Sequence, residues 1–248
     1  MAWPTSAADS DSFNASGSDT TLTFTVDVVA GDLIVLLVGW SDTDDTTVSG
    51  SDSASNSYTD HFSGGHLVQT DTAPFEPWGT MLSAVAGTTA TLSITVTLGA
   101  AKTWREGQAV VIRPDAAGTI SLDGTPNGAG VFNSVPVFTG NITTTTQDTN
   151  CGLTVCGYSG YGLNPSAELI NGTTADAVIE QGGSANCEIW FSRYTTGGTW
   201  QGQATLEGSN QFAAMILAFK TVTGGGGPTL VNRESLRRGI GRGIVRGS

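Results

Sequence analysis

The chain has 248 residues, of which 38% are hydrophobic and 13% are charged. This composition excludes a highly charged disordered chain. The length suffices for one large domain or two small ones. A formal net charge of −12 at pH 7 disfavours nucleic acid and anionic lipid as partners of the body. The 34 glycines, with abundant Thr, Ser and Asn, are typical of strands joined by tight turns.

The beginning of the chain is polar and acidic, so we expect no secretion signal of the usual kind. Leu22, Phe24, Val26 and Val28 then alternate with polar residues, which predicts a half-buried strand. Residues 33–38 are continuously apolar and predict a strand buried on both faces. This run is far too short to span a bilayer.

Further β-patterned segments follow along the body, and no stretch of it has a sustained helical apolar pattern. The predicted strands cover residues 80–86, 90–98, 108–113, 137–145, 152–158, 175–180, 187–195, 200–207 and 212–220. Strands without helices between them favour an antiparallel β-sandwich over alternating β/α units.

The two halves of the body are similar in pattern. Residues 37–41, LVGWS, resemble residues 155–159, VCGYS, and two later strands of the first half recur about 108 residues further on. Two related halves are typical of interlocked Greek keys, as in a jelly roll. We therefore expect residues 1–222 to form one jelly-roll-like antiparallel β-sandwich, with two separate small domains as the alternative.

The sequence offers few candidates for a catalytic or metal site. His61 and His66 lie close together, but the chain has no G-x-S-x-G or HExxH motif, so we interpret them as surface residues and expect no enzyme and no cofactor. Asp42, Asp44 and Asp45 form an acidic loop whose oxygen ligands suit Ca²⁺, although an acidic solvated turn is the commoner explanation.

Aromatic residues in loops provide a candidate glycan site. Trp78 lies between turn residues, and Tyr58 and Tyr161 lie in polar segments. Such side chains can stack on sugar rings while Asp and Asn bond to the hydroxyls. Trp190 and Trp200 lie in strand patterns, where packing in the core is the default.

The end of the chain differs from the body. Residues 223–229 form a Gly/Pro linker, and residues 230–248 form a basic peptide. Five of the chain's 10 basic residues and one acid lie in residues 223–248, so this tail carries +4 and residues 1–222 carry −16. We therefore expect the tail to be an anchor for a partner with acidic groups.

The anchoring peptide alternates apolar residues with arginines when it is read as a strand, and separates them onto opposite faces when read as a helix. Either form becomes stable when it is docked, with apolar anchors buried and arginines paired to carboxylates. The alternatives are a solvated tail and contact with nucleic acid. The predicted partner-binding residues are Arg233, Leu236, Arg237, Arg238, Ile240, Arg242, Ile244 and Arg246.

Two strings of the first half carry a family resemblance. Residues 30–40, AGDLIVLLVGW, and residues 52–59, DSASNSYT, resemble patterns of Gly/Thr-rich β-sandwich proteins from the structural gene modules of tailed bacteriophages. The second half and the Gly-linked Arg/Gly ending are similar to the same group. The resemblance covers the whole body through low-complexity motifs, implies a virion component, and supplies no catalytic residues.

We therefore expect a non-enzymatic phage structural protein that is made in the host cytoplasm and located at the surface of the particle. The first hypothesis is a capsid decoration (cement) protein that binds other virion proteins and copies of itself, as a trimer or other homo-oligomer. The alternative is a tail-fibre or receptor-binding module that recognises a host glycan. A polysaccharide-degrading enzyme is the third. We expect neither nucleic acid nor membrane as a partner.

Overall fold

The computed structural model describes residues 2–42, 45–63, 67–68, 76–115, 118–132, 136–147, 152–160, 165–180, 186–206 and 211–222. Within these ranges antiparallel strands are joined by turns, so the predicted all-β antiparallel sandwich class is confirmed. None of the described residues forms a helix long and apolar enough to cross a membrane. The jelly-roll connectivity stays a prediction, and the linker and anchoring peptide lie outside the described residues.

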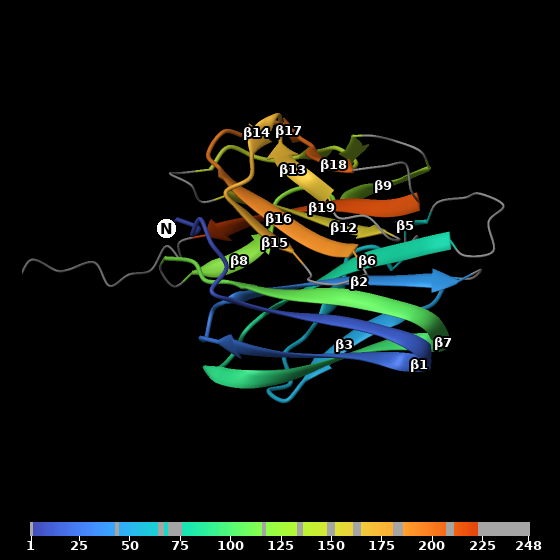
Figure 1. Ribbon diagram of the computed structural model, residues 1–248. Helices are drawn as coiled ribbons and strands as arrows, with labels where there is room; N and C mark the ends of the chain where they lie inside the picture. Colours follow the sequence, from blue (N-terminus) through green and yellow to red (C-terminus); the bar gives the residue numbers. More distant parts are fainter. Residues whose placement is uncertain are drawn as a thin grey trace, which may run out of the picture.

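The strands of the described residues form two large sheets and two small ones (Figure 1). The first large sheet has the order β1 (Asp9–Val28), β7 (Ala90–Ile112), β2 (Leu33–Asp42), β6 (Glu76–Val85) and β4 (Thr59–Asp60), with β3 (Val48–Asp52) beside β7 and β5 (Leu67–Val68) beside β6. The second has the order β15 (Ala177–Glu180), β16 (Asn186–Tyr194), β12 (Gly152–Gly160), β19 (Gln211–Val222) and β8 (Thr119–Leu122), with β9 (Asn127–Phe132) beside β19.

The small sheets belong to the second half of the chain. One has the order β10 (Val137–Phe138), β18 (Gly202–Leu206), β13 (Pro165–Ile170) and β14 (Thr173–Thr174). The other pairs β11 (Ile142–Thr143) with β17 (Thr199–Trp200). In Figure 1 these strands lie on the side of the second large sheet that faces away from β2 and β7.

The long strands β1 and β7 each contribute to two layers. Residues 9–16 of β1 pair with residues 104–111 of β7, whereas residues 21–28 pair with residues 90–97. The register shifts between Ser16 and Thr21, and Arg105 holds this bend by donating to the carbonyls of Gly17 and Thr21 at 3.3 and 2.8 Å. The first large sheet therefore folds over on itself.

In the part of the chain that the structure describes, three apolar clusters separate the layers. The first outer cluster fills the folded first sheet with residues such as Phe24 of β1, Leu36 of β2 and Ile94 of β7. The second outer cluster lies between the second large sheet and the small sheets and contains Trp190 and Ala204. The central cluster joins the two large sheets, and it decides how the halves are arranged.

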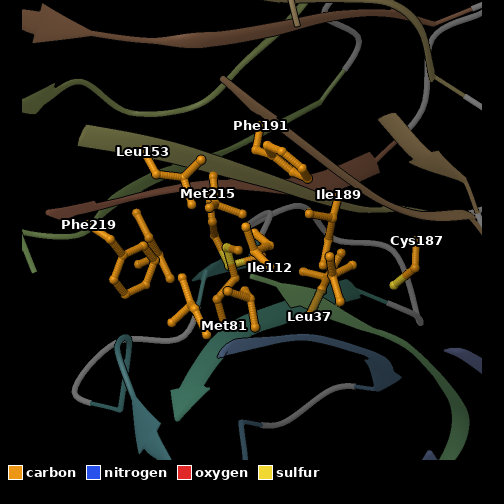
Figure 2. Close-up of a cluster of buried hydrophobic side chains, with 14 of the residues drawn as sticks. Leu37, Met81, Ile112, Leu153, Cys187, Ile189, Phe191, Met215 and Phe219 are labelled. Carbon is orange, nitrogen blue, oxygen red and sulfur yellow. The ribbon is translucent and has the colours of Figure 1, made fainter. Parts of the chain in front are cut away.

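Both large sheets contribute side chains to the central cluster. Figure 2 shows Leu37 and Met81 of the first sheet close to Ile189, Met215 and Phe219 of the second. Because successive residues of a strand point to opposite faces, β2 fills the central cluster with Leu37 and the first outer cluster with Leu36. The prediction that residues 33–38 are buried on both faces is therefore confirmed.

Glycines allow the two large sheets to approach closely at one end. A Cβ atom at Gly39 would overlap the hydroxyl of Ser159, and one at Gly157 would lie 3.0 Å from Leu37 Cδ1. A polar contact crosses the same region, since the Ser159 hydroxyl donates to Glu106 Oε1 at 2.7 Å. The glycines of the two similar sequence strings therefore lie where the sheets meet.

The similarity between the halves extends to strand pairing. In the first half β2 lies between β6 and β7, and in the second half β12 lies between β16 and β19. The sequence strings that resemble each other belong to these strands. Each half thus places its repeated three-strand unit against the central cluster.

Candidate functional site

The acidic loop predicted as a calcium site is described only in part. Asp42 ends β2, Asp44 lies outside the described residues, and Asp45 Oδ1 accepts the amide of Thr46 at 2.7 Å. The described residues contain no group of three or more His, Cys, Asp or Glu arranged to hold a metal ion. The calcium alternative stays a prediction.

The nearby carboxylate of Asp52 organises the loop that follows β3. It accepts the amides of Ala54 and Asn56 at 2.9 and 3.1 Å, and the Asn56 side-chain amide and the Tyr58 hydroxyl at 2.8 Å each. Burial alone would raise the pKa of Asp52, but these hydrogen bonds hold it below its usual value. The charge of Asp52 thus stabilises the conformation of the loop.

The predicted glycan-binding aromatics do not share one surface. Trp78 stacks on Trp40 with ring centroids 6.4 Å apart, at one end of β6. Tyr58 packs against the first outer cluster, beside Thr59, which pairs with Ser83 near the other end of β6. Five positions of a strand span about 16 Å, so the two side chains are well separated. Tyr161 lies outside the described residues.

A cleft of about 520 Å³ lies where the two halves meet. Its polar lining consists of His61 with Ser55, Asn56, Ser57, Thr59, Ser83 and Ser121. Its apolar lining consists of Leu33, Ala84, Val85, Ile120, Leu122 and Phe219. The first half supplies β2, β4, β6 and the Asp52 loop, and the second supplies β8 and β19, so the cleft depends on the packing of both halves.

His61 is more buried than a surface residue, contrary to the interpretation from sequence. A hydrogen bond of 2.8 Å joins its Nε2 to Ser83 Oγ, and its ring makes a T-shaped contact with the ring of Phe219 at a centroid distance of 6.3 Å. Burial lowers the pKa of His61, and the charge of Asp60 only partly offsets this effect. The neutral imidazole is therefore favoured. His66 lies outside the described residues.

The wall formed by the Asp52 loop is fixed in shape. Besides its bonds to Asp52, the Asn56 side chain accepts the amide of Gly87 at 2.8 Å. Ser55 has a φ of 61°, a conformation that a non-glycine residue adopts only when its surroundings impose it. Sequence reasoning missed this cleft because its polar groups come from separate segments and form no motif; the sole signal was the Asx-type spacing of Asp52, Ala54 and Asn56.

The remaining predicted site residues lie outside this region. All the predicted partner-binding residues belong to residues 230–248 and lie outside the described residues. Of the cysteines, Cys156 and Cys187 are buried free thiols on opposite faces of the second large sheet, because Cys156 belongs to the second outer cluster and Cys187 to the central cluster. Burial raises the pKa of both thiols, which disfavours a reactive thiolate.

Comparison of the chain with protein-family models, with curated proteins and with solved structures finds no match. The function is therefore inferred from the residues and from the geometry of the body.

Proposed function

We propose that this chain is a non-enzymatic structural protein of a bacteriophage particle, in which the β-sheet body is displayed and the C-terminal peptide is the anchor. A capsid decoration protein is the form that we favour. The proposal is supported by the sequence resemblance in residues 30–40 and 52–59, and by the opposite charges of body and tail.

The observation that carries the proposal is the contrast between a body of −16 and a tail of +4. Arginines pair strongly with carboxylates, often through two parallel hydrogen bonds. A Gly/Pro segment between body and tail would let the basic peptide reach a partner while the acidic bodies stay apart. Such a tail suits attachment to a preformed shell.

The place where the tail leaves the body also supports anchoring. The last described strand, β19, pairs with β12 along one side and with β9 and β8 along the other. Its residues from Phe212 to Phe219 are buried, whereas Val222 at its end is 48% exposed. A force on the tail would therefore act on a strand that is hydrogen-bonded on both sides. This arrangement suits a tail that attaches the body to a particle.

Removal of residues 223–248 tests the anchor. We expect the truncated chain to fold, because the three apolar clusters consist of residues before 223, and to be absent from purified particles. A matched variant that replaces all five tail arginines with lysine keeps the charge and should retain part of the incorporation. Incorporation of the truncated chain at the normal copy number would contradict the proposal.

The second candidate is a tail-fibre or receptor-binding module that recognises a carbohydrate. The observation that favours it is the cleft between the halves, whose lining mixes hydroxyls with apolar side chains. Immunogold labelling of intact particles separates the two candidates. Label over the head supports the decoration protein, and label at the tail tip supports the receptor-binding module.

A further inference from the structure

The cleft between the two halves has the size and the shape stability of a small-molecule site. Its volume of about 520 Å³ lies within the range of roughly 300–1,000 Å³ usual for ligand pockets. The hydrogen bonds of Asp52 and Asn56 hold one wall in place without a ligand. Binding would therefore require little reorganisation of that wall.

The charge of the lining is unusual for this chain. Among the described residues that line the cleft, none is Asp, Glu, Lys or Arg, although residues 1–222 carry −16. His61 adds no fixed charge at neutral pH because burial lowers its pKa. A charged ligand would lose its hydration without gaining an ion pair, so the cleft favours a neutral ligand.

The hydrogen-bonding groups of the lining are only partly satisfied. Ser83 Oγ is bonded to His61, and the Asn56 side chain is bonded to Asp52 and Gly87. Among the described residues, the structure gives no hydrogen-bond partner to the side-chain hydroxyls of Ser57, Thr59 and Ser121. These groups can therefore exchange water for a ligand with hydroxyls of its own.

The opposite part of the lining is apolar. Ile120, Leu122 and Phe219 of the second half approach the cleft together with Leu33 and Val85 of the first. Two of them remain accessible, since Leu122 is 36% and Val85 is 42% exposed. A fully apolar ligand would cover these groups but would displace water from the hydroxyls of Ser57, Thr59 and Ser121 without replacing its hydrogen bonds. The lining suits a molecule that has both C–H faces and many hydroxyls.

We propose that this cleft binds a neutral saccharide, with the hydroxyls of Ser57, Thr59 and Ser121 facing the sugar hydroxyls and with Ile120, Leu122 and Phe219 covering a C–H face of the ring. The site differs from the aromatic residues predicted from sequence. The inference does not depend on where the protein lies in a particle, so its failure would leave the decoration proposal unchanged.

Methyl NMR of the full chain tests the proposal. The probes are the methyl glycosides of glucose, galactose, mannose and N-acetylglucosamine, titrated separately. At least one should give saturable shifts at the methyl groups of Leu33, Val85, Ile120 and Leu122. If none of the four does so, or if shifts appear only at methyl groups that do not line the cleft, the proposal is overturned.

Two variants and a matched control refine the test. Ser57→Phe places a large side chain at an exposed loop position in the cleft wall and should abolish the shifts. Ser49→Phe makes the same change at an exposed position of β3 outside the cleft and should leave them intact. Ser121→Ala should weaken binding about 2- to 10-fold, the usual effect of one hydrogen bond. Equal binding by the wild type, Ser57→Phe and Ser121→Ala would overturn the proposed site.

Discussion

At the scale of single residues, some carboxylates of this acidic chain stabilise its interior. Asp32 is buried and bound by Arg113, whose guanidinium lies 2.9 Å from it. Asp123 is also buried and accepts hydrogen bonds from Tyr194 at 2.6 Å, from Lys220 at 3.2 Å and from both the amide and the hydroxyl of Thr145. Each half of the body therefore has a buried carboxylate with a basic partner.

Replacement of Asp123 by Asn should destabilise the protein at neutral pH. An amide cannot accept all the hydrogen bonds that the carboxylate accepts, so donors on Tyr194 and Thr145 would lose a partner. We expect the free energy of unfolding to fall by about 1–3 kcal/mol, as for other buried groups left unpaired. Urea denaturation of both proteins at neutral pH measures the difference.

The same variant should change how stability depends on acid. Burial alone would raise the pKa of Asp123, but its hydrogen bonds hold the folded value below the ordinary 3.8. The stabilisation is therefore present above pH 3.8 and is lost as the pH falls through the folded pKa. The difference in the free energy of unfolding between the wild type and Asp123→Asn should therefore become smaller at acidic pH. Asp115→Asn, an exposed change, is the control; a gap that stays constant would contradict this explanation.

At the scale of elements, strands were predictable where the apolar residues of the sequence follow the pattern of burial. The alternation from Leu22 to Val28 and the run from Leu33 to Val38 predicted half-buried and fully buried strands, and both are confirmed. The first part of β1 was not predicted, because residues 9–20 contain little apolar surface. There the carboxylates of Asp9 and Asp11 accept the amides of Asp27 and Thr25 at 2.6 Å each, so side chains cover the amides of an edge.

Other differences have a tertiary cause. The predicted strands at residues 90–98 and 108–113 are parts of one strand, β7, because its polar middle continues the ladder with β1 through the bend held by Arg105. The candidate site was less predictable than the fold. Its walls meet only when β8 and β19 pack beside β4 and β6, and no local pattern encodes that contact.

Because both faces of β2 are buried, two successive residues of this strand should each be costly to replace with alanine. Leu36→Ala and Leu37→Ala should each lower the free energy of unfolding by about 2–5 kcal/mol, because each opens a cavity in a different cluster. In β1, Val26→Ala should also be costly, whereas Thr25→Ala should change stability by about 0.5 kcal/mol or less, since its side chain is exposed. Chemical denaturation of the four variants gives the comparison. Tolerance of either leucine change would contradict burial on both faces.

At the scale of the whole molecule, the halves depend on each other. Each large sheet has one face in the central cluster and the other in an outer cluster, so neither half can lose its structure without exposing apolar surface of its neighbour. The packing of the halves also forms the cleft, because β8 and β19 supply one part of its lining and β4 and β6 supply the other. Packing of the halves against each other is therefore a condition for the proposed saccharide site.

The shared central cluster predicts a single unfolding transition. Methyl signals of Val26, Leu37 and Ala204 report on the first outer, central and second outer clusters. In urea their intensities should disappear with the same midpoint, because loss of the central cluster removes support from both halves at once. Ile189→Val in the central cluster should lower the free energy of unfolding by about 0.5–1.5 kcal/mol and so lower all three midpoints together. Separate midpoints for Val26 and Ala204 would mean that the halves unfold independently, and the cleft could then open without unfolding of either half.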